Sequence, residues 1–106
     1  MMRMAAVDLQ NFIQGKELYA YDPVTREKIA QVTYGSDGRC VVMFANGTND
    51  RGTYGFLEDT YWTRYDVFRN GETNSFYLTR VGPELAQAYH LDGRPAYLQS
   101  PDRTLS

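Results

Sequence analysis

The stretch GSDGRCVVMFANG, residues 35–47, decides the fold, because it places one apolar segment between two turn dipeptides. Asp-Gly and Asn-Gly pairs supply the positive φ angles that a tight two-residue hairpin needs. Further pairs of the same kind flank other short segments that are rich in aromatic and β-branched residues, and the full set is Asp37-Gly38, Asn46-Gly47, Asn70-Gly71 and Asp92-Gly93. The chain is therefore predicted to be an antiparallel β-meander.

Eight short strands are predicted between these turns, at residues 16–21, 28–34, 39–45, 48–56, 60–69, 72–81, 85–90 and 95–99. The strand at 39–45 is almost continuously apolar, which is typical of a strand that is covered on both faces. Gly52 and Gly55 predict a bulge or a sharp bend. Because closure hides every strand edge, we expect an up-and-down barrel, with a sandwich or an open, strongly curved sheet as the alternative.

One short helix is predicted ahead of the strands, over residues 8–15. Asp8 is a suitable N-cap residue, and Gly15 is a suitable helix end. Leu9, Phe12 and Ile13 recur on one face of this segment. Since so short a helix is marginal by itself, we expect it to pack across one end of the sheet as a plug.

The chain has 106 residues, which is the length of a single domain. Its ends, 1–7 and 100–106, are predicted to fray, and the second of them is polar. The composition includes nine Tyr, five Phe and one Trp, which favours a sheet with a wet face or a cavity lined by rings.

The charges nearly balance, at 11 Lys plus Arg against 13 Asp plus Glu, and no basic cluster is visible. Nucleic acid is therefore not an expected partner. No apolar run has the roughly 18–20 residues of a membrane span, so no membrane insertion is expected. The N-terminus shows no apolar region of a signal peptide, which favours a cytoplasmic location, or a periplasmic one if a leader has been removed.

The segments around Asn70-Gly71 form the clearest predicted hairpin. A two-residue loop would place Arg64 opposite Tyr77 on one face and Tyr65 opposite Phe76 on the other. The face with Tyr65 and Phe76, together with Thr63 and Leu78, is the better candidate for the core.

Four residues of this hairpin are the candidate ligand-binding set: Trp62, Arg64, Tyr65 and Tyr77. Trp62, Arg64, Asp66 and Phe68 share one face of their strand, and Tyr77 lies opposite. If that face lines a barrel interior, it offers a cation, an acceptor, a hydroxyl and two rings to a small polar-aromatic or anionic ligand. The alternative is an outward face, where Arg64 stacks on neighbouring rings and pairs with Asp66 for stability alone.

Neither of the two most reactive residue types predicts catalysis. His90 is the single histidine, and we expect it to face solvent at a strand end, just before a turn. Cys40 is the single cysteine, so an internal disulfide and a multi-cysteine metal site are excluded, and its apolar strand predicts a buried, unreactive thiol. No nucleotide-binding or hydrolase motif is present, and we expect no cofactor, no metal and no enzyme activity.

Four short motifs of the chain, GKEL at 15–18, YGSDG at 34–38, GTYG at 52–55 and DTYWTR at 59–64, follow a recognisable order. In this order the chain resembles the small bacterial lipocalin-like domains of unknown function, over residues 15–98. The resemblance implies a calycin-like barrel, commonly encoded with a leader peptide and commonly of unassigned role.

A barrel of this class favours non-catalytic binding of a small molecule in its mouth, which is an argument by analogy of fold. The alternative hypothesis is a protein-interaction or homodimerisation module that uses an exposed aromatic face or an edge strand. An enclosed cavity would favour the first hypothesis, and a filled interior with an outer apolar patch would favour the second.

Overall fold

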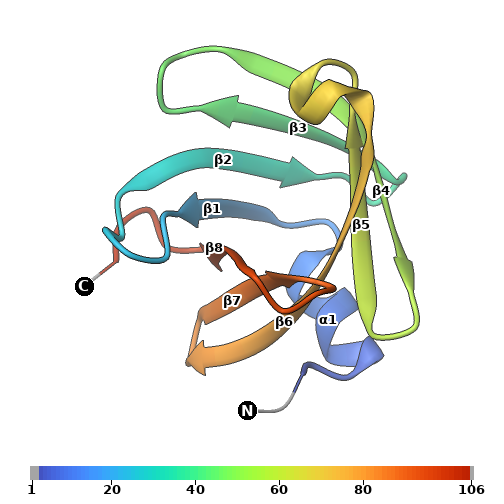
Figure 1. Cartoon of the computed structure of the whole chain (residues 1–106), viewed down its shortest axis with the longest axis vertical. Helices are drawn as coiled ribbons and strands as arrows, with labels where there is room; N and C mark the ends of the chain where they lie inside the picture. The colour runs from blue at the N-terminus through green and yellow to red at the C-terminus, as the bar shows by residue number, and fades with distance from the viewer. Residues whose placement is uncertain (1–2, 106) are drawn as a thin grey trace.

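The computed structural model describes residues 3–105 and confirms the predicted fold: a closed barrel of eight antiparallel strands in chain order, preceded by one short helix (Figure 1). The elements are α1 Ala6–Ile13, β1 Glu17–Tyr21, β2 Lys28–Tyr34, β3 Arg39–Phe44, β4 Asn49–Leu57, β5 Thr60–Tyr65, the 3-10 turn η1 Phe68–Gly71, β6 Thr73–Gly82, β7 Leu85–His90 and β8 Pro95–Ser100. β1 pairs with both β2 and β8, so the sheet closes on itself.

The two ends of the barrel are built differently. Since successive strands run in opposite directions, the loops 22–27, 45–48, 66–72 and 91–94 gather at one end, which we call the open end. The loops 35–38, 58–59 and 83–84 gather at the other end, which we call the helix end because α1 leads into β1 there. Figure 1 shows α1 and η1 at opposite ends of the barrel.

The helix plugs its end of the barrel, as predicted. Leu9 and Ile13 are completely buried in the main core, and Phe12 packs against that core. The predicted N-cap is wrong, because the helix begins at Ala6 and places Asp8 inside its first turn. Ala5 takes the N-cap position in an extended conformation without a side-chain hydrogen bond, and Gly15 follows the helix with a positive φ of 71°.

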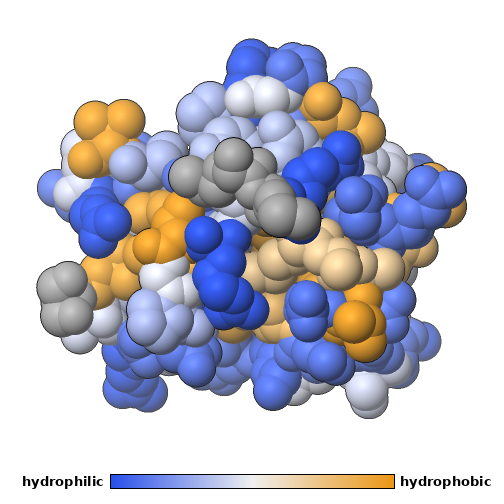
Figure 2. Space-filling view, turned by 90° about the horizontal axis from the view of Figure 1, so that it is seen from below, coloured by the Kyte–Doolittle hydropathy of each residue, from blue (hydrophilic) through white to orange (hydrophobic). Residues whose placement is uncertain are grey.

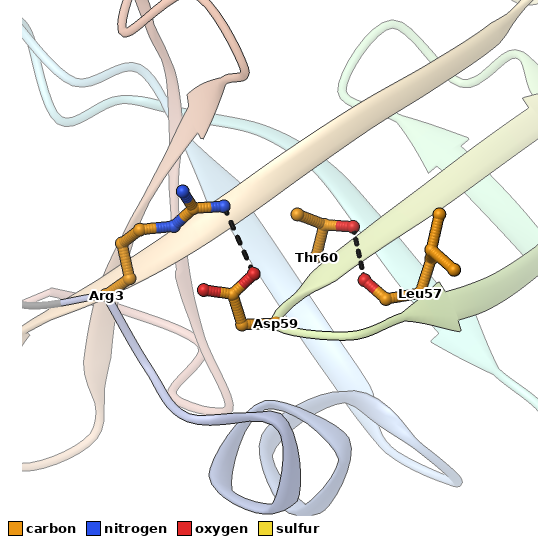
Figure 3. Close-up of polar contacts among 4 residues, drawn as sticks. All are labelled: Arg3, Leu57, Asp59 and Thr60. Atoms are coloured by element: carbon orange, nitrogen blue, oxygen red, sulfur yellow. Dashed lines mark hydrogen bonds and ion pairs between the residues drawn. The ribbon is translucent and has the colours of Figure 1, made fainter.

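The segment before the helix makes contacts with the barrel, whereas the sequence predicts that residues 1–7 fray; residues 1 and 2 lie outside the described part. The Met4 amide donates a hydrogen bond of 2.7 Å to the Leu78 carbonyl. Arg3 reaches the turn between β4 and β5, where its Nη2 lies 3.3 Å from Asp59 Oδ1 (Figure 3). In the same turn Thr60 Oγ1 donates to the Leu57 carbonyl.

The C-terminal segment also makes contacts with the barrel, whereas the sequence predicts that residues 100–106 fray. Tyr19, Tyr21 and Leu98 form a second, smaller apolar cluster, against which Leu105 packs. The Tyr21 hydroxyl donates to the Asp102 carbonyl. The C-terminal segment thus covers the outward-facing rings of β1, which its polar composition did not predict.

Strand β3 is covered on one face only, which corrects the expectation of a strand buried on both. Cys40 and Val42 point inward and are buried, whereas Val41 and Met43 are 49% and 52% exposed. The physical reason is that the sheet closes on itself, so no second layer covers this part of its outer face.

The β5–β6 pair has the predicted faces but a different register. Arg64 pairs with Thr73 rather than with Tyr77, a shift of four positions. β5 ends at Tyr65, and residues 66–72 form a longer loop than the predicted one. Because the shift is even, Thr63, Tyr65, Phe76 and Leu78 still point inward, and the predicted core face is confirmed.

Gly52 does not form the predicted bulge, since β4 pairs with β3 and with β5 through this position without a register shift. Its role is to let the backbones of β4 and β5 approach closely. A Cβ atom at this position would collide with the Arg64 carbonyl oxygen and lie 2.8 Å from Tyr65 Cα. The backbones of β4 and β5 could not both stay in place around such an atom.

We therefore expect Gly52→Ala to lower the free energy of unfolding by about 3 kcal/mol, the upper range for steric overpacking. The comparison variant is Gly15→Ala, where a Cβ meets no atom within 4 Å and only the positive φ opposes it. That strain costs about 1 kcal/mol. Urea unfolding of both variants measures the difference, and equal losses would contradict the role given to Gly52.

Candidate functional site

A cavity of about 280 Å³ lies inside the open end of the barrel. Apolar and aromatic side chains supply most of its wall, and the polar ones are few. Its lining consists of Ala20, Ile29, Ala30, Val32, Tyr34, Val42, Phe44, Thr63, Tyr65, Phe68, Arg69, Phe76 and Tyr97. These residues come from β1, β2, β3, β5, η1, β6 and β8. Closure of the barrel therefore assembles the site.

A hydrogen-bonded group of phenols lies beside the cavity. Gln99 Nε2 donates to the hydroxyls of Tyr34 and Tyr61, at 3.2 Å each, and the hydroxyls of Tyr61 and Tyr97 bond to one another. Burial raises the pKa of Tyr34 and Tyr61 well above the ordinary value and that of Tyr97 to about 12. These phenols therefore stay neutral, and they are linked to one another and to Gln99 by hydrogen bonds.

Arg69 is the charged member of the lining. Its guanidinium carbon lies 5.2 Å from the centroids of both the Phe68 and the Phe76 rings, a geometry that permits cation–π attraction. Its Nη1 atom is buried and has no hydrogen-bond partner. The backbone of Arg69 and of the following Asn70 is left-handed, with φ of 58° at each, and this conformation directs the loop around the arginine.

Asp50 holds the loop that carries Arg69. Its Oδ2 accepts hydrogen bonds from the amides of Val67 at 2.9 Å and Phe68 at 2.8 Å. These bonds stabilise the charged form of the carboxyl and lower its pKa. The carboxylate thus acts as the cap of η1, for which the sequence of the loop offers no cap of its own.

His90 ends its strand just before a turn, as predicted, but it is only partly exposed. It lies opposite Phe76 in the β6–β7 ladder at the open end, and the two ring centroids are 5.3 Å apart. Burial lowers its pKa, and the positive charges of Arg69 and Arg94 lower it further, while Asp92 opposes them. The strand alternation that buries Ala86 and Ala88 places His90 on the same side of β7.

Cys40 is buried, as the apolar strand predicted. Burial raises the pKa of its thiol, so the reactive thiolate is disfavoured.

Of the four predicted ligand-binding residues, only Tyr65 lines the cavity. Trp62, Arg64 and Tyr77 lie on the outer face, because side chains alternate along a strand and Thr63 and Tyr65 occupy the inner one. Tyr77 stacks on Tyr89 with 5.2 Å between ring centroids. An inward-facing site built from all four residues is therefore wrong.

The alternative prediction, an outward face whose side chains only stabilise the sheet, is confirmed only in part. Trp62 lies against Gly55 on the neighbouring strand β4, where a Cβ atom would touch its indole ring. Arg64 Nε donates 3.1 Å to the Gly71 carbonyl. The predicted ion pair of Arg64 with Asp66 is not among those formed by residues 3–105.

The sequence reasoning missed Arg69 and Tyr97. It named Phe68 as a ring of the candidate pocket, and Phe68 does line the cavity, although it comes from η1 rather than from a strand. Tyr34 could have been found, since it alternates with Ala30 and Val32 on the inward side of its strand. Arg69 gives no such signal, because a loop conformation rather than a strand period turns it inward.

The chain matches no model of a known protein family, no curated protein and no solved structure. Within residues 3–105, no group of three or more His, Cys, Asp or Glu side chains could hold a metal ion. The described part also contains no helix with the length and apolar character needed to cross a membrane.

Removing the cap of η1 should loosen the loop of Arg69. We expect Asp50→Ala to lower the free energy of unfolding by about 1–2 kcal/mol, because two loop amides lose their acceptor. Asp66→Ala is the matched control, since Asp66 is an exposed carboxylate of the same loop whose side chain makes no hydrogen bond described for residues 3–105. Thermal unfolding and amide exchange of residues 66–72 measure the effect, and equal behaviour of the two variants would refute the capping role.

The lowered pKa of His90 predicts how stability changes with pH. Between its folded pKa and the unfolded value of about 6.5, the unfolded chain binds more protons, so stability falls as pH drops from about 7.5 toward 5.5. His90→Phe should flatten this dependence, because the chain has no other histidine. Urea unfolding across that pH range measures it, and an unchanged slope in the variant would contradict the prediction.

Proposed function

We propose that this protein binds a small, mainly apolar molecule, without catalysis, in the cavity at the open end. The observation that carries the proposal is the cavity itself, whose wall is apolar and aromatic with a few polar groups, as in small-molecule sites generally. Well-packed interiors leave few voids larger than one water, so a hollow of about 280 Å³ needs an explanation.

The cavity volume limits the size of the occupant. At about 30 Å³ for each water-sized group, 280 Å³ accommodates roughly nine non-hydrogen atoms. Ala20, Ala30, Val32 and Val42 keep this space free, because small side chains stand where larger ones would fill it. We infer an occupant of the size of a medium-length alkyl chain or one aromatic ring with substituents.

We also propose a place for the chain among the lipocalin-like domains. The closed up-and-down barrel with an N-terminal helix at one end and a hollow at the other supports the resemblance of the four sequence motifs. Fold alone does not determine function, so the ligand proposal depends on the cavity rather than on this likeness.

The alternative, a protein-interaction or homodimerisation module, has weaker support. The edge-strand form of this hypothesis has no free edge to use, because β1 pairs with β8. Val41 and Met43 are half-exposed neighbours on β3 and would be the place to look for an outer contact. On the face seen in Figure 2, hydrophobic residues form separate small patches among hydrophilic ones.

Filling the cavity should abolish binding. We expect wild type to bind 1-octanol saturably, and Val42→Phe to lose at least about tenfold in affinity because the larger ring occupies the space. Val41→Phe, at the outward-facing neighbour, should bind as wild type does. NMR titration of inward-facing amides measures both. Saturable binding that survives Val42→Phe, or no binding to wild type, would refute the proposal.

A further inference from the structure

We propose that the ligand of this cavity is a monocarboxylate with an apolar body, and that Arg69 binds its carboxylate at the open end. This inference rests on the proposed function and names the chemical class of the ligand. It is argued from the one charged group of the cavity wall, whose hydrogen-bonding capacity the protein leaves unused.

Arg69 Nη1 differs from the other buried atoms that lack a partner. In residues 3–105, three buried side-chain polar atoms have none: Arg69 Nη1, Thr79 Oγ1 and Gln99 Oε1. Only Arg69 belongs to the lining of the cavity. A buried polar atom without a partner is destabilising, and more so when it belongs to a charged group. An acceptor supplied from within the cavity would remove this penalty.

The protein offers no anion of its own to Arg69. No carboxylate of the described residues lies within 4.0 Å of its guanidinium. The carboxylate of Asp50 on β4, which holds the loop, accepts hydrogen bonds from the amides of Val67 and Phe68. The rings of Phe68 and Phe76 hold the guanidinium by its apolar faces and leave its N–H edge for a ligand.

The charge of the site fits a single negative group. One unpaired cation balances a carboxylate, whereas a phosphate dianion would need further donors. Near the opening, the charges of Arg69 and Arg94 both lower the pKa of His90, and Asp92 opposes them. Arg94 is itself paired with Asp92 at 2.7 Å, which leaves Arg69 as the cation available inside.

The geometry also orients the ligand. Arg69 comes from the loop 66–72 at the open end, so the carboxylate lies near the opening. The apolar body then lies deeper, against Ala30, Val32 and Val42. Beside this space, Gln99 Nε2 donates to the hydroxyls of Tyr34 and Tyr61, and the Tyr61 hydroxyl is bonded to that of Tyr97.

The test compares three ligands that share one alkyl chain and differ in the head group: octanoate, 1-octanol and octylamine. Affinities are measured by NMR titration at about pH 7.5, where a carboxylic acid of ordinary pKa is ionised. The variants are Arg69→Met, which keeps apolar contact with both phenylalanines but removes the charge, and Arg69→Lys, which keeps the charge. Arg39→Met is the matched control, because Arg39 is an exposed arginine at the start of β3 next to the helix-end loop 35–38.

We expect wild type to bind octanoate at least about tenfold more tightly than 1-octanol, and octylamine most weakly. Arg69→Met should lose the preference for octanoate while still binding 1-octanol. Arg69→Lys should keep part of the preference, and Arg39→Met should keep all of it.

Three outcomes would overturn this inference. If wild type binds 1-octanol as tightly as octanoate, or if the preference survives Arg69→Met, the ligand class is wrong while the proposed function stands. If wild type binds none of the three ligands, both the inference and the proposed function fail. The 1-octanol affinity of Arg69→Met distinguishes loss of the carboxylate contact from loss of the fold.

Discussion

The pairing of β1 with β8 is the constraint on which the rest of the structure depends. The register of Tyr19 with Ser100, Ala20 with Gln99 and Tyr21 with Leu98 joins the first strand to the last. Closure satisfies every strand edge with backbone hydrogen bonds, and it also brings Tyr97 and Gln99 of β8 across from residues of β1 and β2. Without it there would be neither an interior nor a cavity.

Inside the closed sheet, residue size divides the barrel into a filled half and a hollow half. At the helix end, Leu9 and Ile13 of α1 and the rings of Tyr54 and Tyr61 occupy the interior. At the open end, Ala20, Ala30 and Val42 leave space that no neighbouring side chain fills. A void of this kind sacrifices packing energy in an otherwise dense core, and the proposed ligand binding depends on this feature.

Arg69 has two energetically unfavourable features, one in its backbone conformation and one in its side-chain environment. Arg69 adopts a left-handed backbone that favours glycine, and its Nη1 is buried without an acceptor. Both features cost stability, and the capping of η1 by Asp50 holds them in place. Such a combination is typical of positions that act on a ligand, whereas the outward Trp62, Arg64 and Tyr77 pair with neighbours in the ordinary manner of a sheet surface.

The sequence by itself determined the strand order, the direction of most side chains and the plugging helix. These features follow from local chemistry: Asx-Gly turns, alternation along a strand and the apolar face of residues 9–13. It did not determine the β5–β6 register, because a loop that could close at two residues instead spans 66–72. Nor did it reveal the packing of Arg3 and Leu105 or the site at Arg69. Those depend on contacts between segments far apart in the chain and on loop dihedral angles, and only the closed barrel fixes them.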